Sequence, residues 1–242
     1  TAQSPGRHFV PKASLYDWSY NVCYKGFTNN ESYALLALLP NYLERGNSSL
    51  VYMVDGLIQA TRDADSGFFL NEFETIAAIL KRREAKQQKT LLWGVTYALL
   101  DFCETHPMNL KHTRVLETGG MKGRRKEMVK EELHEILKKG FGVSRIYSEY
   151  GMTELLSQAY SHGENRFTCP AHMAVVMRDT SDPLSTVPLG VTGGINIIDL
   201  ANIYSCAFIA TEDLGKLHSD GTFEVLGRFD AAEVRGCNLM VQ

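Results

Sequence analysis

Two patterns of hydrophobic residues follow one another along the chain. Up to about residue 150, short apolar runs at 33–39, 90–95 and 113–117 alternate with longer segments whose apolar residues recur at helical spacing. Continuous apolar runs of this length are typical of strands buried on both faces of a sheet. The alternation predicts an α/β fold with a mainly parallel sheet, flanking helices and right-handed crossovers.

Capping residues and turn residues delimit the expected helices. We expect helices over 14–27, over 49–60 with Ser48 or Ser49 as the N-cap, and over 97–106 before Pro107. Asn71 with Glu74 resembles a capping box, and the helix that follows ends in a basic stripe at 81–86. Residues 67–70 form a short strand, and a further helix runs from about 126 to 139, with Gly140 as its stop.

After about residue 165 the pattern changes to short β-rich runs. These runs cover 172–179, 192–200, 205–211, 215–220 and 221–228, and they are separated by Asp-Pro, Gly-Gly, Asp-Leu-Gly and Asp-Gly turns. The pattern predicts a smaller antiparallel β subdomain. We therefore divide the chain into an α/β part at 1–165 and a β-rich part at 166–242.

Residues 145–155, RIYSEYGMTEL, combine an apolar strand, a turn and polar side chains. We expect the turn at Tyr150-Gly151 to lead into a helix, and ligands collect at such a strand end in open α/β sheets. A Tyr ring can stack on a base, while Thr153 and Glu154 offer oxygen ligands to a Mg²⁺ ion that phosphates carry. By itself, the stretch is equally consistent with a strand edge and a turn in which Glu154 is merely solvated.

Charge, apolar runs and cysteine content limit the partners and the cellular compartment that we expect for this protein. The net charge of −3 and pI near 6.2 give no electrostatic reason to expect nucleic acid or an anionic membrane as partner. No apolar run approaches the roughly 20 residues of a membrane span. Five scattered cysteines favour a reducing compartment, so we expect a cytoplasmic protein, with Cys23, Cys103 and Cys206 in the core. Cys169 and His172 are the nearest approach to a metal pair, but no second pair accompanies them.

Four motifs that could bind a ligand occur in a fixed order. A glycine loop at 118–123 exposes backbone N–H groups close to Lys122, Arg124 and Arg125. YGMTE follows, then the segment ATEDLG with Asp213 at the end of a strand, and then GRFD at 227–230. Each motif alone occurs in unrelated proteins. Their order is more specific than any one of them.

This order resembles the adenylate-forming superfamily of acyl ligases. The resemblance implies ATP and Mg²⁺ as cofactors, with the metal at Glu154. It implies that the nucleotide-binding residues are Gly119, Gly120, Tyr150, Gly151, Thr153, Asp213, Arg228 and Asp230. Tyr150 would stack on adenine, Asp213 would bind the ribose hydroxyls, and Arg228 and Asp230 would lie at the ribose and at a hinge.

Within the superfamily the chain resembles the acyl-protein synthetases of the LuxE family, through runs at 6–11, 38–55, 117–125, 148–161 and 227–240. The resemblance implies activation of a fatty acid and transfer of the acyl group to a cysteine thioester, then to an acyl-accepting partner protein. The implied catalytic residues are Cys237, Thr153 and Glu154. The acyl-binding residues would be Trp93, Gly94, Tyr97 and Met121.

The resemblance also indicates what the chain lacks. TAQSP at residues 1–5 looks like the tail of the superfamily's phosphate loop, so we expect the chain to be truncated at its N-terminus. The chain stops just after the hinge, without the C-terminal domain whose lysine assists adenylation, and Lys122, Arg124 or Arg125 could substitute. Two alternatives stay open: an acyl- or aryl-CoA ligase, since RGCN also resembles the hinge of phenylacetate–CoA ligases, and an inactive nucleotide- or acyl-binding scaffold.

Overall fold

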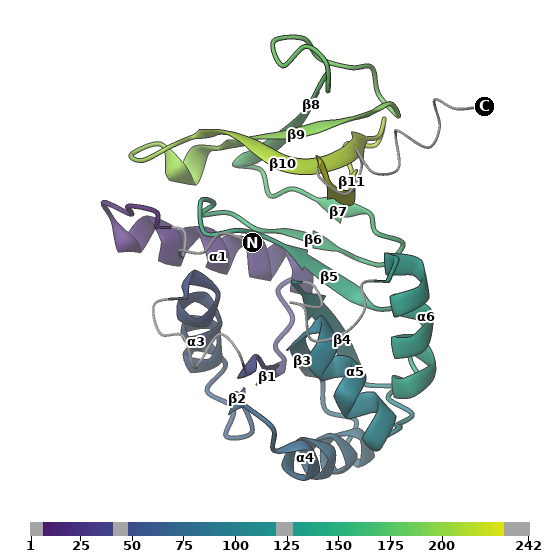
Figure 1. The fold of residues 1–242 in the computed structure, drawn as a ribbon. Coiled ribbons are helices and arrows are strands. Elements are labelled where there is room, and N and C mark those ends of the chain that lie inside the picture. The colour runs from purple at the N-terminus through teal and green to yellow at the C-terminus, as the bar shows by residue number, and fades with distance from the viewer. Residues whose placement is uncertain (1–6, 41–47, 120–127, 230–242) are drawn as a thin grey trace, which may run out of the picture.

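The computed structural model describes residues 7–40, 48–119 and 128–229, and Figure 1 shows their arrangement. Its first five strands are β1 (Ala34–Leu38), β2 (Gly67–Phe69), β3 (Thr90–Val95), β4 (Thr113–Thr118) and β5 (Tyr147–Tyr150). They pair in the order β2-β1-β3-β4-β5, and every pair among them is parallel. The predicted parallel α/β part is confirmed.

Helices cover both sides of these strands. Helices α1 (Ala13–Thr28) and α3 (Ser49–Thr61) lie on one side, whereas α5 (Thr96–Thr105) and α6 (Lys130–Phe141) lie on the other (Figure 1). Helix α4 (Phe73–Ala85) packs beside α5, with the rings of Phe73 and Phe102 at 5.5 Å. None of the described helices is long and apolar enough to cross a bilayer.

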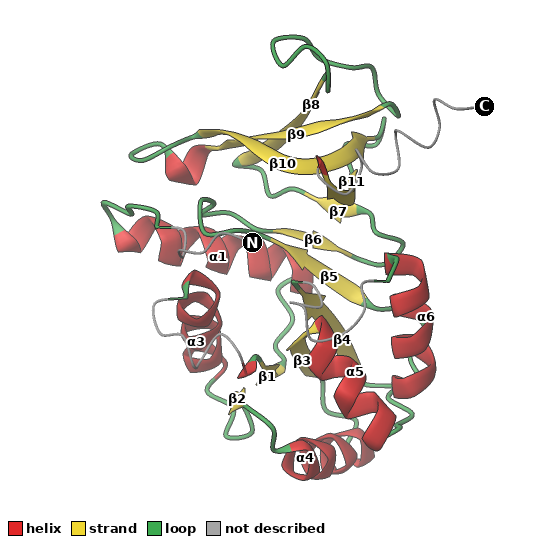
Figure 2. Cartoon of the chain, viewed as in Figure 1, coloured by secondary structure: helices red, strands yellow, loops and turns green. Residues whose placement is uncertain are grey.

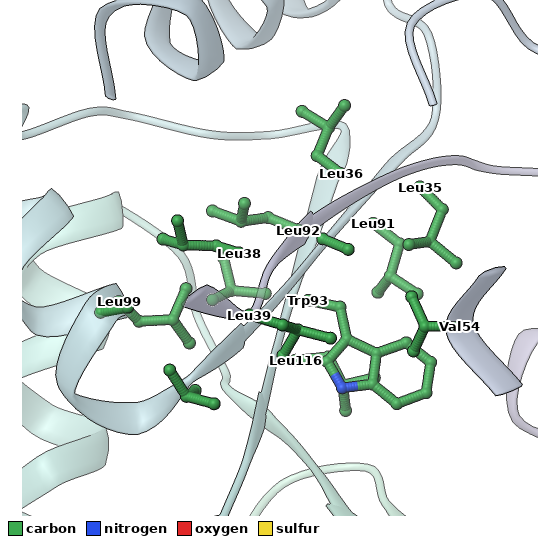
Figure 3. Packing of buried hydrophobic residues seen from close by; sticks show 14 of the residues in the cluster. Leu35, Leu36, Leu38, Leu39, Val54, Leu91, Leu92, Trp93, Leu99 and Leu116 are labelled. Atoms are coloured by element: carbon green, nitrogen blue, oxygen red, sulfur yellow. The ribbon is translucent and has the colours of Figure 1, made fainter. Parts of the chain in front are cut away.

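The main hydrophobic core lies between the two helical layers. All residues of β1 and β3 are buried, as expected for strands covered on both faces. Leu38, Leu92 and Trp93 meet side chains from α3 and α5 in this core, among them Val54 and Leu99 (Figure 3). Gly94 is required here, because an added Cβ would lie 2.7 Å from two side-chain carbons of Leu99.

The C-terminal strands continue the same sheet in antiparallel fashion (Figure 2). They are β6 (Ala159–Ser161), β7 (Phe167–Thr168), β8 (Met173–Arg178), β9 (Thr192–Asp199), β10 (Phe208–Leu217) and β11 (Phe223–Arg228), with the short 3₁₀ helix η1 (Leu200–Asn202) after β9. A second hydrophobic cluster forms around Tyr150, Phe167 and Phe223. The antiparallel β-rich part is confirmed, whereas its boundary at 165/166 stays a prediction.

Two predictions about secondary structure after residue 150 are wrong. The turn after Tyr150 leads into β6 rather than into a helix, because the N–H groups of Leu156 and Ser157 donate to Asp199 instead of to helical carbonyls. The runs at 205–211 and 215–220 do not form two strands separated by a turn. Residues 208–217 form the single strand β10, and the Asp-Leu-Gly segment is a bulge where the register shifts between Leu214 and Gly215.

Two helix boundaries also differ from prediction. Asn71 is not the N-cap of α4. Glu72 occupies that position, and its carboxylate accepts from the N–H groups of Leu70 and Asn71. Helix α6 ends at Phe141, and Gly142, with φ of 64°, provides the left-handed cap predicted for Gly140. Gly140 serves packing instead, since an added Cβ would lie 2.7 Å from the Cys103 thiol.

Side-chain burial corrects one further expectation and locates one buried ion pair. Cys23 and Cys103 are buried as expected, but Cys206 is exposed, in the connection between η1 and β10. The basic stripe at 81–86 includes one buried side chain, since Arg83 is only 5% exposed. Its guanidinium contacts Asp63 at 3.1 Å and Asp65 at 2.9 Å, and donates to the Thr90 hydroxyl at 2.9 Å. Arg83 therefore ties α4 to β3 and to the loop before β2.

Arg83→Leu should destabilise the fold. Removing one partner of a buried ion pair typically costs about 3–5 kcal/mol, and because both aspartates are partly exposed we expect a loss of about 3 kcal/mol. Arg82→Ala is the matched control, because Arg82 also contacts Asp65 but is half exposed and should cost about 1 kcal/mol or less. Urea unfolding measures both, and equal losses would contradict the tie assigned to Arg83.

Candidate functional site

The candidate site lies at the carboxyl edge of the parallel strands. Register pairs Val95 with Thr118 and Thr118 with Glu149, so β3, β4 and β5 end side by side. Gly119 and Gly151, which directly follow β4 and β5, are both exposed. The structure thus brings the start of the glycine loop next to the YGMTE turn, at the edge where open α/β sheets bind ligands.

Tyr150 and Asp213 meet, although 63 residues separate them. The Tyr150 hydroxyl donates to Asp213 Oδ2 at 2.7 Å. The Tyr150 ring is only 9% exposed and packs edge-on against Phe167 and Phe223, with centroid distances of 6.0 and 5.6 Å. Burial raises the pKa of Asp213 above its ordinary value, and the tyrosine hydroxyl partly offsets this rise. Two residues predicted for nucleotide binding therefore form one contact.

Of the other residues predicted to bind nucleotide, Arg228 lies within the described residues, whereas Gly120 and Asp230 do not. Arg228 is the cross-strand partner of Asp213, but its guanidinium pairs with the exposed carboxylate of Glu212. Gly120 and Asp230 lie outside the described residues, as do Met121, Cys237 and the basic residues Lys122, Arg124 and Arg125. The contacts of these residues therefore stay predictions.

Thr153 and Glu154 lie in the turn after β5, and both residues are exposed. A hydroxyl and a carboxylate directed to solvent suit a hard cation such as Mg²⁺, which keeps waters and binds one or two carboxylates together with phosphate. Among the described residues, no group of three or more His, Cys, Asp and Glu side chains could hold a metal ion. These two residues thus fit a metal that arrives with phosphates.

The predicted acyl-binding residues lie in the core. Trp93 is fully buried and Tyr97 is 2% exposed. Trp93 and Gly94 are successive strand residues and so face opposite sides of the sheet. The Trp93 indole N–H has no hydrogen-bond acceptor within the described part of the chain. A role for these residues in acyl binding stays a prediction.

Sequence reasoning missed two carboxylates at this edge. Glu149, on β5, is partly exposed and accepts from the Thr118 hydroxyl at 2.5 Å. Desolvation of this partly buried carboxyl group, with a further contribution from the Glu117 carboxylate, raises the pKa of Glu149 to about 7. Glu117, on β4, is buried, yet Lys130 Nζ at 2.8 Å and His134 outweigh that burial and lower the pKa of Glu117 to about 2.

The two shifts separate neighbouring carboxyl groups into one that is ionised and one that titrates near neutral pH, a pattern common in active sites. The available sequence signal was a Glu near the end of each of two adjacent predicted strands. That signal is weak, because the shifts arise from partners on α6 and on the neighbouring strand.

A groove of about 340 Å³ lies at the opposite, amino edge of the sheet. Its lining carries more cations than anions, namely Lys89, Lys111, Arg114 and Arg145 against Glu31. Helices α1, α4, α5 and α6 end within a few residues of this lining. Two of these cations already pair with Glu31, because Lys89 Nζ lies 2.6 Å and an Arg114 guanidinium nitrogen 3.6 Å from its carboxylate.

The raised pKa of Glu149 predicts a pH dependence of stability. The pKa of Glu149 is about 7 in the folded protein and 4.5 ordinarily, so folding favours the protonated carboxyl group. Glu149 therefore contributes its full stabilisation of the fold below about pH 4.5, and this contribution is lost as pH rises through 7. Glu149→Gln should remove this loss and gain on the order of 1–3 kcal/mol over wild type between about pH 5 and pH 8. Glu117 stays ionised across that window. Urea unfolding across pH checks this, and parallel curves for the two proteins would refute it.

Several solved structures have a fold similar to that of this chain. The chain is similar to ATP-bound MatB from Rhodopseudomonas palustris, with a TM-score of 0.66, 15% identity, and coverage of 88% of this chain and 44% of that one. A benzoate CoA ligase from Burkholderia xenovorans gives a TM-score of 0.59 and 16% identity, covering 90% of this chain and 46% of that one. The amide bond synthetase McbA from Marinactinospora thermotolerans gives a TM-score of 0.56 and 16% identity, covering 90% of this chain and 45% of that one.

These similarities confirm the expected fold of an adenylation domain, and the chain spans less than half the length of each of the three. No curated protein sequence matches the chain. The family model described as "Acyl-protein synthetase, LuxE" matches residues 59–242, which is most of the chain. The chain therefore belongs to the LuxE family of acyl-protein synthetases.

Proposed function

We propose that the protein is an ATP-dependent ligase that converts a carboxylic acid to an acyl-adenylate and passes the acyl group to the thiol of Cys237. The observation that carries this proposal is the Tyr150–Asp213 contact of 2.7 Å at the carboxyl edge of the sheet. It joins an aromatic ring and a carboxylate suited to a ribose diol. The exposed Thr153 and Glu154 follow directly on the same turn.

In the first step a carboxylate oxygen of the acid attacks the α-phosphate of ATP. A P–O bond forms, the bond to pyrophosphate breaks, and pyrophosphate leaves with its electron pair. Asp213 would accept from the ribose hydroxyls, and Thr153 and Glu154 would hold Mg²⁺, which would neutralise charge on the phosphates. With a pKa of about 7, Glu149 is partly protonated at neutral pH and so repels the anionic reactants less than an ordinary glutamate would.

In the second step the Cys237 thiolate attacks the acyl carbonyl, a thioester forms, and AMP leaves. Dividing one difficult transfer into two steps is the general advantage of covalent catalysis. Arg235, two residues before Cys237 in the sequence, would lower the pKa of the thiol. We infer that the acid is a fatty acid and that a partner protein finally accepts the acyl group, because the LuxE family model covers residues 59–242.

An acyl- or aryl-CoA ligase is the second candidate. The similarity to a benzoate CoA ligase favours it, together with the hinge-like RGCN at 235–238. In that case CoA, rather than Cys237, takes the acyl group from the adenylate. ATP binding without acid-dependent pyrophosphate exchange would instead indicate an inactive scaffold.

Asp213→Asn should weaken ATP binding. Loss of hydrogen bonds to a charged acceptor costs about 1.5–3 kcal/mol, so the KM for ATP in pyrophosphate exchange should rise roughly 10- to 150-fold. Asp220→Asn is the matched control, since Asp220 is an exposed carboxylate on the turn between β10 and β11. An unchanged KM in Asp213→Asn would contradict the assigned role.

Cys237→Ser should abolish covalent acylation. Intact-mass measurement of the full-length protein after incubation with ATP, Mg²⁺ and fatty acid should show an adduct that hydroxylamine removes, and the serine variant should lack it. The exposed Cys206 provides the control, so Cys206→Ser should retain the adduct. An adduct that persists in Cys237→Ser refutes the thioester role, and CoA-thioester formation by that variant favours the second candidate.

A further inference from the structure

Side chains of β9 and η1 form hydrogen bonds with the turn that carries Thr153 and Glu154 and with the residues directly after it. Asp199, the last residue of β9, is completely buried. One of its oxygens accepts from the N–H groups of Leu156 at 2.8 Å and Ser157 at 3.0 Å, and the other accepts from the Ser157 hydroxyl at 2.5 Å. A buried carboxylate with several donors is fixed in place. The chain just after Glu154 is therefore anchored.

Asn202, three residues after Asp199, contacts the turn itself. Its side chain is nearly completely buried, and Nδ2 donates to the main-chain carbonyl of Glu154 at 2.6 Å. The direction of this bond settles the orientation of the amide, because only the NH₂ group can donate to a carbonyl. Asn202 Oδ1 consequently points the other way and is available as an acceptor.

That acceptor is used by a distant part of the chain. His8 Nε2 lies 2.9 Å from Asn202 Oδ1, across 194 residues of sequence. Since Oδ1 can only accept, His8 must carry a hydrogen on Nε2. His8 belongs to GRHFVP at 6–11, directly after the segment that resembles the tail of a phosphate loop. Asn202 thus connects the segment that contains His8 with the main chain of Glu154.

We propose that Asn202 is a positioning residue that fixes Glu154 relative to the segment containing His8, so that the carboxylate meets the metal carried by ATP phosphates. The inference rests on the proposed function. Asn202 and His8 do not touch the reacting atoms in this account. They act by holding main chain, and small displacements of a metal-binding carboxylate reduce binding and rate.

Calorimetric binding of MgATP to the full-length protein, together with pyrophosphate exchange as a function of Mg²⁺ concentration at saturating acid, tests the inference. Asn202→Ala removes both hydrogen bonds and should raise the half-saturating Mg²⁺ concentration roughly tenfold, as expected for losing two ordinary hydrogen bonds. Asn202→Asp keeps the acceptor for His8 but cannot donate to Glu154, and should show most of the same shift. His8→Ala should show a smaller shift, which His8→Gln should restore because its amide can donate.

Asn165→Ala is the matched control for lost stability. Asn165 is also buried, and its amide donates to the carbonyl of Val225 at 2.9 Å, away from the turn. This variant should lower the melting temperature while leaving the Mg²⁺ dependence unchanged. Unchanged Mg²⁺ dependence in Asn202→Ala, or an equal shift in Asn165→Ala, overturns the inference. Absence of exchange in the wild type overturns the proposed function, and the positioning role falls with it.

Discussion

Burial of the parallel strands on both faces is the constraint on which the rest of the structure depends. All residues of β1 and β3 are buried, so helices must cover both sides of them, and each strand must return through a helix to the same edge. Every strand of this part then ends at one edge, where Gly119 and Gly151 are exposed. The place of the candidate site follows from the way the core is closed.

The antiparallel strands add what the parallel sheet alone lacks. They continue from β5 through β6 and β7 to β11 and β10, which brings Asp213 to the hydroxyl of Tyr150. They also carry Asp199 and Asn202, whose side chains hold the turn after β5. The β-rich part therefore supplies the Asp213 carboxylate and the support for the turn that carries Glu154, although its hydrophobic cluster is separate from the main core.

The sequence predicted the parallel strands well because their apolar runs are continuous and helices separate them. It failed where a tertiary contact outweighs local pattern. Residues after Tyr150 were expected to be helical, yet Asp199 binds the N–H groups that a helix would use. The Asp-Leu-Gly segment was expected to be a turn, but pairing with both β9 and β11 makes it a bulge. The motifs pointed to Tyr150 and Asp213, which the fold brings into contact, whereas Glu149 and Asn202 belong to no motif and emerge only from their contacts.

The Tyr150–Asp213 contact has a further consequence for the proposed nucleotide site. A carboxylate has two oxygens and about four lone-pair positions, so Asp213 can accept from the Tyr150 hydroxyl through Oδ2 and still accept from a ribose diol. The same contact holds the tyrosine ring against Phe167 and Phe223, which limits the directions from which a base can approach it. Adenine and ribose would then be recognised by one coupled unit. Substitutions at Tyr150 and Asp213 should accordingly act together rather than additively, since residues in direct contact commonly interact by about 0.5–3 kcal/mol.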